Sequence, residues 1–160
     1  MYPPTHFLLP FTIGLIFIKL GIFNIYHVFI CAILGVLIDI DHYIMHIIKS
    51  KDKKLSLRDT WNQSTKYHAF RQRSFIHHNK GILIVSLIVI LLFFINMTSA
   101  YIIAIAYYSH IILDYIHITK QEKYYKFRIF SLYLRESYSE VDLDIALSIL
   151  ILVLSAGIFI

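Results

Sequence analysis

The chain contains the stretch Gly35-Val-Leu-Ile-Asp39-Ile-Asp41-His42-Tyr-Ile-Met-His46, in which two carboxylates and two imidazoles end an apolar segment. On a helix Asp39, His42 and His46 lie at i, i+3 and i+7 and share one stripe, whereas Asp41 joins them only if the helix loosens. Carboxylate and imidazole groups together suit a divalent metal such as zinc, manganese or iron. A polar helix end hydrated at a membrane surface also explains this stretch taken alone, so the rest of the chain has to decide.

The composition indicates a membrane protein. Hydrophobic residues make up 58% of the 160 residues and charged residues 16%, and the mean hydropathy is +0.68. A soluble domain has roughly half apolar and about a quarter charged residues. The net charge of +5 is explained by basic loops between membrane spans, so we expect no direct contact with nucleic acid. The single cysteine, Cys31, lies in an apolar segment and is expected to pack in the core.

The apolar segments predict an all-α fold, a polytopic membrane bundle of about five spans within one integral membrane domain, 1–160. A span needs roughly 20 apolar residues, with about 17 as the lower limit. Turn residues at Gly21 and Asn24, and later at Asn96, separate neighbouring segments. The expected spans are 7–23, 25–48, 81–96, 99–118 and 143–160.

The basic residues orient this bundle. All 15 lysines and arginines except Lys19 lie in two loops, 49–80 and 119–142. Positively charged loops stay in the cytoplasm, so both loops and the N-terminus are expected on the cytoplasmic side of the inner membrane. An odd number of spans then leaves the C-terminus outside.

Acidic and imidazole side chains gather in the cytoplasmic layer, where His6 opens the first span. In the fourth span His110, Asp114 and His117 stand at i, i+4 and i+7 and share one stripe. A charged side chain in the bilayer costs about 2.5–3.5 kcal/mol, so Asp39 and Asp114 should be shielded in the bundle or bound to a cation. Two helices each carry a stripe of Asp and His at the same depth in the membrane. This pattern predicts a polar cluster that binds a metal at the cytoplasmic side.

The order of these motifs resembles a known family. His6 is followed by Gly35-x-x-x-Asp39-Ile-Asp41-His42, then by Arg73-x-x-x-His77, and then by Ser109-His110-x-x-Leu113-Asp114. This order resembles the membrane-bound metal-dependent hydrolases, also described as LexA-binding, inner-membrane-associated hydrolases. That family is similar in motif order to the zinc-dependent phospholipase C group, which cleaves phosphate esters.

The resemblance implies a set of metal ligands: His6, Asp39, Asp41, His42, His77, His110 and Asp114. This chain also departs from the family pattern. Ile38 replaces the usual proline, Gln72 replaces the first histidine of the third motif, and Ser74 replaces its glycine. Loss of that histidine weakens the ligation of a second or third metal unless His68 or His78 substitutes.

The expected activity is hydrolysis, because a bound divalent metal lowers the pKa of its coordinated water towards about 7. Zinc is the first choice of metal, and manganese or iron comes next. Asp41 would bridge two metals or accept the proton, and Arg73 is the best candidate to clamp a phosphate. The substrate would then be a phospholipid or another amphiphilic phosphate ester. The alternative is a non-enzymatic membrane protein whose polar cluster is structural and whose basic loop recruits a protein partner or anionic lipid. An ion transporter fits less well, because the carboxylates cluster at one face rather than at mid-membrane.

Overall fold

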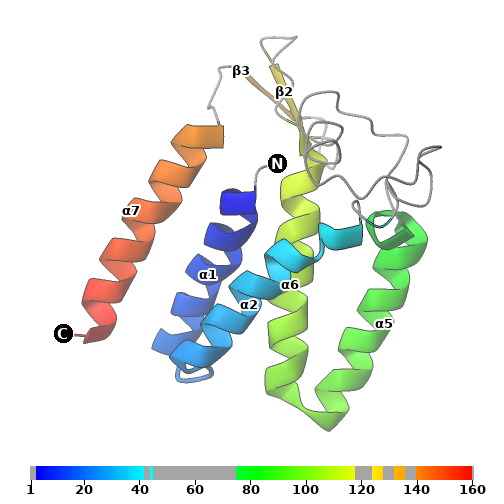
Figure 1. The fold of residues 1–160 in the computed structure, drawn as a ribbon, viewed down its shortest axis with the longest axis horizontal. Helices are drawn as coiled ribbons and strands as arrows, with labels where there is room; N and C mark the ends of the chain where they lie inside the picture. The colour runs from blue at the N-terminus through cyan, green and yellow to red at the C-terminus, as the bar shows by residue number, and fades with distance from the viewer. Residues whose placement is uncertain are drawn as a thin grey trace.

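The computed structural model of this chain describes residues 3–41, 44, 75–117, 124–127, 132–135 and 140–159. Within these residues five long helices run side by side (Figure 1). A short 3-10 helix, η2 (Phe75–His77), comes directly before the third long helix. The long helices are α1 (Pro3–Lys19), α2 (Ile25–Leu37), α5 (Asn79–Ile95), α6 (Met97–Tyr115) and α7 (Glu140–Phe159).

Each long helix coincides with one of the five predicted apolar segments, so the prediction of a helical bundle is confirmed, with shifted boundaries. The largest shift is in α2, which ends at Leu37 and not near residue 48. After Leu37 the hydrogen bonds change to the i to i−3 pattern, with Asp39 N donating to Val36 O and Asp41 N to Ile38 O. In the described part of the chain, no helix combines the length and the apolarity that crossing a membrane requires.

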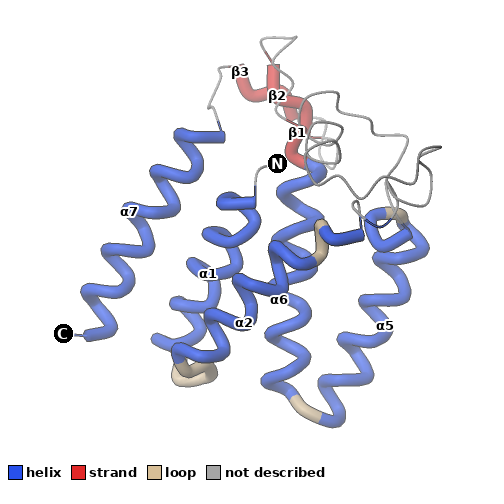
Figure 2. The backbone as a smooth tube through the Cα atoms, viewed as in Figure 1, coloured by secondary structure: helices blue, strands red, loops and turns tan. Residues whose placement is uncertain are grey.

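Besides the helices, the described residues form a small antiparallel sheet that was not predicted. Its strands are β1 (Ile116–His117), β2 (Tyr124–Phe127) and β3 (Leu132–Arg135), in the order β1-β2-β3. Ile116 pairs with Phe127, and Phe127 pairs with Leu132. The strands lie beyond the carboxyl end of α6 (Figure 2). Aromatic residues favour strands, and β2 and β3 lie in the segment 119–142 that the sequence predicts as a basic loop.

Short turns join the helices at the other end of the bundle. Gly21 adopts a positive φ of 72° between α1 and α2, a conformation that glycine accepts readily. Asn24 then caps α2, because its Oδ1 accepts from His27 N at 3.1 Å while its own N–H donates to His27 Nδ1 at 3.3 Å. Asn96 caps α6 in the same way by accepting from Ser99 N. Both predicted turns are therefore confirmed.

Helix α1 lies at the centre of the bundle and contacts α2, α6 and α7, while α5 packs against α6. The core between α1, α2 and α6 contains Leu15, Val28, Cys31, Ile102 and Ile105. Cys31 is fully buried there, which confirms its predicted packing role.

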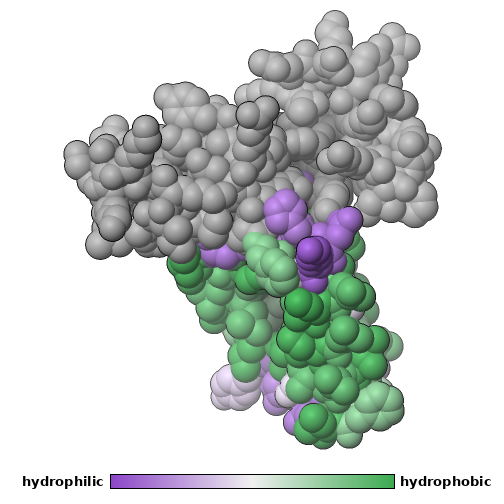
Figure 3. Space-filling view, turned by 90° about the vertical axis from the view of Figure 1, so that its right-hand side faces the viewer, coloured by the Kyte–Doolittle hydropathy of each residue, from purple (hydrophilic) through white to green (hydrophobic). Residues whose placement is uncertain are grey.

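The start of α1, the turn after α2, η2 and the end of α6 meet at one end of the bundle (Figure 1). Away from that end the outer helices present apolar side chains to their surroundings, and these cover most of the described surface in Figure 3. On α5 the exposed residues include Leu83, Leu87, Leu91 and Phe94, the last of them 86% exposed. Helix α7 has a similar surface at Ile145, Ile149 and Leu152.

Candidate metal centre

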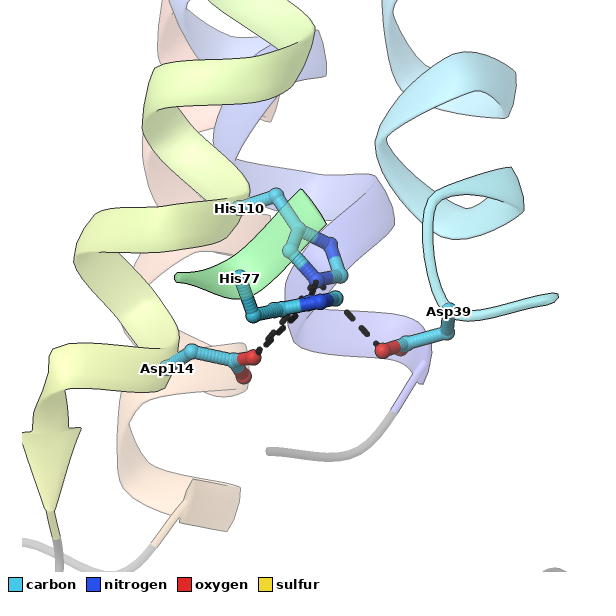
Figure 4. A group of neighbouring side chains, drawn as sticks. All are labelled: Asp39, His77, His110 and Asp114. Carbon is cyan, nitrogen blue, oxygen red and sulfur yellow. Dashed lines mark hydrogen bonds and ion pairs between the residues drawn. The ribbon is translucent and has the colours of Figure 1, made fainter. Parts of the chain in front are cut away.

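Three separate segments bring two carboxylates and two imidazoles together where these ends meet. His77 comes from η2, while His110 and Asp114 come from the last two turns of α6. Asp39 comes from the turn that follows α2. Figure 4 shows the four side chains pointing toward one another from their different elements. Both histidines are buried, and the Asp39 side chain is 29% exposed.

The ligand atoms of this cluster lie close enough together to hold one metal ion. His77 Nε2 lies 3.0 Å from His110 Nε2 and 3.3 Å from Asp114 Oδ2. His110 Nε2 lies 3.4 Å from Asp39 Oδ1. One ligand atom from each of the four residues falls within 4.8 Å of all the others. Tetrahedral zinc with bonds of about 2.0–2.1 Å separates its ligand atoms by ~3.3 Å, so these residues fit a single divalent cation.

In His77 and His110, the hydrogen bond made by Nδ1 determines that Nε2 faces the cluster with its lone pair. His110 Nδ1 lies 2.7 Å from the carbonyl oxygen of Gly35, which can only accept, so Nδ1 carries the proton. His77 Nδ1 donates in the same way to Asp41 Oδ2 at 2.9 Å. Each neutral ring therefore directs the lone pair of Nε2 into the cluster. A carbonyl or carboxylate on the outer nitrogen is the usual partner of a metal-binding histidine.

Without a metal, a proton takes the place of the cation between the two rings. Burial lowers the pKa of His77, but the carboxylates of Asp114 and Asp41 outweigh that effect and raise the pKa to about 9. At neutral pH His77 is therefore protonated in the metal-free protein. A metal that binds here would displace this proton, because a histidine ligand has to be neutral at the coordinating nitrogen.

A third histidine adjoins the cluster on its other side. His6 is fully buried, and its ring stacks on that of His110 with centroids 4.0 Å apart and an interplanar angle of 21°. Its Nε2 lies 3.4 Å from Asp114 Oδ1 and 3.8 Å from Asp39 Oδ2. Neither ring nitrogen makes a hydrogen bond to any described residue.

Two close contacts hold the segments in place. Gly35 lies so close to α1 that an added Cβ would stand 2.6 Å from His6 O and 2.9 Å from Pro10 Cγ. Because Gly35 has no side chain, α2 can approach α1 closely and present the Gly35 carbonyl to His110. On the other side, Tyr107 Oη donates to Ile76 O at 2.6 Å and ties η2 to α6.

The profile of the family described as YdjM inner membrane protein matches residues 1–130. The chain belongs to this family. The match includes every candidate ligand and ends before α7. Neither the curated proteins nor the solved structures contain a significant match to the chain. Membership of the YdjM inner membrane protein family supports the predicted membrane localisation, and it carries no statement about hydrolysis.

Of the seven ligands suggested by sequence in this YdjM-family chain, the structure brings six together: His6, Asp39, Asp41, His77, His110 and Asp114. His42 lies outside the described residues, and so does Arg73, the expected phosphate clamp. Asp41 contacts the outer nitrogen of His77, a position from which it can orient that ring. Its expected role as a ligand or base stays a prediction.

Two further expectations have clear outcomes. His117 does not extend the helical stripe of His110 and Asp114, because α6 ends at Tyr115 and residue 117 belongs to β1. His78, considered as a substitute ligand, is exposed beside the buried His77. His68 and Gln72 lie outside the described residues.

Two supporting groups, the Gly35 carbonyl and the Tyr107 hydroxyl, were not predicted from the sequence. Gly35 was visible only as part of a motif, and its backbone role has no side-chain signal. Tyr107 stands three residues before His110, and this i, i+3 spacing places both on one helix face. This spacing is the sequence feature from which a role for Tyr107 near the cluster could have been predicted.

Proposed function

We propose that this chain is a membrane-bound, metal-dependent hydrolase that holds a divalent cation with His77, His110, Asp39 and Asp114. The observation that carries the proposal is the pair of imidazole Nε2 atoms 3.0 Å apart, each with its other nitrogen engaged as a donor. Two imidazoles and two carboxylates suit zinc, and manganese or iron would also accept them. The metal that we propose is zinc, with manganese or iron as the alternatives.

The protein's own residues prepare the site for hydrolysis. Asp41 and the Gly35 carbonyl hold the two histidine rings in the tautomer that leaves Nε2 free to coordinate. Burial of His77 and His110 excludes water from the closed side of the cluster, whereas the partly exposed Asp39 leaves one side accessible. A divalent cation in this position supplies Lewis acidity, which lowers the pKa of a coordinated water to about 7.

We further propose that the helices span the inner membrane, with the cluster, the N-terminus and the loops 49–80 and 119–142 at the cytoplasmic side. The family description, the exposed apolar surfaces of α5 and α7, and the basic residues confined to the two loops all support this arrangement. A cluster at the helix ends would meet lipid headgroups. The substrate class we propose is therefore a phospholipid or another amphiphilic phosphate ester, with Arg73 as the candidate clamp for its phosphate.

The test is turnover by the purified full-length chain in detergent on a panel of phospholipids and lipid phosphates with added zinc or manganese. We expect metal-dependent phosphate ester cleavage by the wild type and by His78→Gln, a matched histidine variant one residue outside the cluster. His110→Gln should lose turnover by a factor of about a hundred or more, because loss of a group that merely orients a ligand already costs about 10–100-fold. If metal-loaded wild type cleaves nothing on phosphoester and amide panels, the metal is structural and the hydrolase proposal is wrong.

A further inference from the structure

His77 reaches the cluster from a very short element. Its backbone belongs to η2, a single 3-10 turn of three residues (Figure 4). A turn this short has little stability of its own, because nucleating helical structure costs more than one hydrogen bond returns. His110 and Asp114, in contrast, lie one turn apart on α6, and the helix fixes them relative to each other. The contacts of η2 therefore set the distance from His77 to these two ligands.

The Ile76 carbonyl is the point at which α6 holds η2. Tyr107 Oη donates a hydrogen bond to Ile76 O at 2.6 Å, one residue before His77. Tyr107 is 3% exposed, so water competes little for this bond. It stands three residues before His110, which places both on one face of α6. Tyr107 thus links the backbone of η2 to the helix that carries His110 and Asp114.

Gly81, in the first turn of α5, packs against the same stretch of backbone. An added Cβ would stand 2.8 Å from Ile76 O and 2.8 Å from Ile76 Cα, and it would also clash with Phe75 O. No change of rotamer relieves a clash with backbone atoms. Gly81 is buried, so this contact cannot open toward solvent without moving α5. Glycine at this position lets α5 begin directly after η2 and pack closely against it.

We propose that Tyr107 and Gly81 are positioning residues, which act through the backbone at Ile76 to set the place of His77 in the metal centre. Neither residue supplies a ligand atom. A functional constellation has to be held within about 0.5 Å of its productive geometry, and groups that orient a metal ligand are worth about 10–100-fold in affinity. The inference rests on the proposed function, because it concerns the same metal centre.

The test compares two tyrosines that are adjacent on α6. Tyr108 Oη pairs with Ser86 Oγ at 2.7 Å, so its hydroxyl also joins α6 to α5, but through a residue beyond the first turn of α5. Tyr107→Phe and Tyr108→Phe therefore each remove one hydroxyl between these elements. Full-length protein in detergent is stripped with a chelator and titrated with Co²⁺, whose visible spectrum reports its coordination geometry.

The tyrosine variants should differ in how they bind Co²⁺. Tyr107→Phe should bind it about tenfold more weakly than the wild type and with an altered spectrum, because His77 no longer meets the ion at the right place. Tyr108→Phe should keep the wild-type affinity and spectrum, even if its melting temperature falls as much. A merely structural role for Tyr107 would lower the melting temperature and leave the spectrum unchanged.

A pair of glycine variants tests the other contact. Gly81→Ala should weaken Co²⁺ binding by about 10–100-fold, since the added Cβ pushes η2 away from α5. Gly157→Ala is the matched control, because its Cβ would meet only the flexible Lys19 Nζ, at 2.8 Å. If either Tyr107→Phe or Gly81→Ala does not fold, the other variant decides by the same comparison with its control.

The possible results separate this inference from the hydrolase proposal. Wild-type affinity and spectrum in both Tyr107→Phe and Gly81→Ala would show that the positioning role is wrong and would leave the metal centre intact. A wild type that binds neither Co²⁺ nor Zn²⁺ contradicts both the metal centre and the positioning role. Turnover is not part of this readout, so a protein that binds metal as expected but cleaves nothing contradicts the hydrolase proposal alone.

Discussion

His77 Nε2 and His110 Nε2 lie 3.0 Å apart, although the partners of their Nδ1 atoms leave both Nε2 atoms as lone pairs in the neutral rings. Two lone pairs at this distance repel each other unless a positive charge lies between them. A proton on His77 provides that charge in the metal-free protein. A divalent cation would provide it better, because it would also draw the carboxylates of Asp39 and Asp114 into its coordination sphere.

The first prediction concerns the pH dependence of the metal-free protein. The pKa of His77 is about 9 in the folded state and about 6.5 in the unfolded chain. A raised pKa stabilises the fold fully below pH 6.5, and this stabilisation is lost as the pH rises to 9. The melting temperature in excess chelator should therefore fall between pH 6.5 and 9, for a loss of about 3 kcal/mol by linkage.

His77→Gln should remove most of this dependence, while His78→Gln should keep it. A wild-type melting temperature that is constant or increases over the same interval would show that His77 is not protonated by its carboxylate neighbours.

The second prediction separates two roles for Asp41. Because its Oδ2 accepts from His77 Nδ1, Asp41→Ala should weaken metal binding by about 10–100-fold. Asp41→Asn should weaken binding less, since the amide oxygen still accepts that hydrogen bond. Competition with a coloured chelator measures both affinities. At saturating metal, Asp41→Asn should recover most of the wild-type turnover, whereas abolished turnover at full occupancy would restore the base role inferred from sequence.

The third prediction tests the close approach of α1 and α2. A Cβ at Gly35 would meet His6 O at 2.6 Å, and backbone atoms cannot move as cheaply as a side-chain tip. Gly35→Ala should therefore destabilise the protein by about 1–3 kcal/mol and weaken metal binding. Gly157→Ala is the matched control, because its Cβ would meet the flexible end of Lys19 at 2.8 Å. Equal melting temperatures for the two variants would refute this account of Gly35.

The fourth prediction concerns orientation in the membrane. Lys53 belongs to the first basic loop, and Asn96 lies in the turn between α5 and α6. Cysteines at these two positions should react with impermeant reagents from opposite sides, with Asn96→Cys labelled in intact cells. The Cys31→Ala background removes the native thiol. Labelling of Lys53→Cys in intact cells would reverse the orientation and put the cluster outside.

Much of the helical framework could be predicted because a long apolar segment needs no tertiary information. The apolar segments located the five long helices of the described residues, and Asn24 and Asn96 marked two of the turns between them. The sheet was missed because its strands are two to four residues long. Such short stretches of tyrosine, phenylalanine and leucine become strands only when they pair with each other.

The candidate ligands could be predicted as residue types, but their roles depend on packing. Periodicity placed His110 and Asp114 on one face of a helix. Asp41 reaches the cluster because the chain forms i to i−3 turns after α2. The sequence had indicated that Asp41 joins the stripe only if the helix loosens at this point. The division of labour between Asp39 and Asp41 follows from which oxygen meets which nitrogen, and spacing along the chain cannot specify that.

The most direct test of the central claim is the divalent metal content of the purified full-length chain, compared with the Asp39→Ala, His110→Ala double variant. Because this variant removes a ligand from each of two elements, the account predicts tightly bound zinc, manganese or iron in the wild type and little in the variant. Restoring the metal should raise the melting temperature of the wild type alone, since a ligand bound to the native state stabilises it. Equal metal content in both proteins would contradict the claim that this cluster is a metal centre.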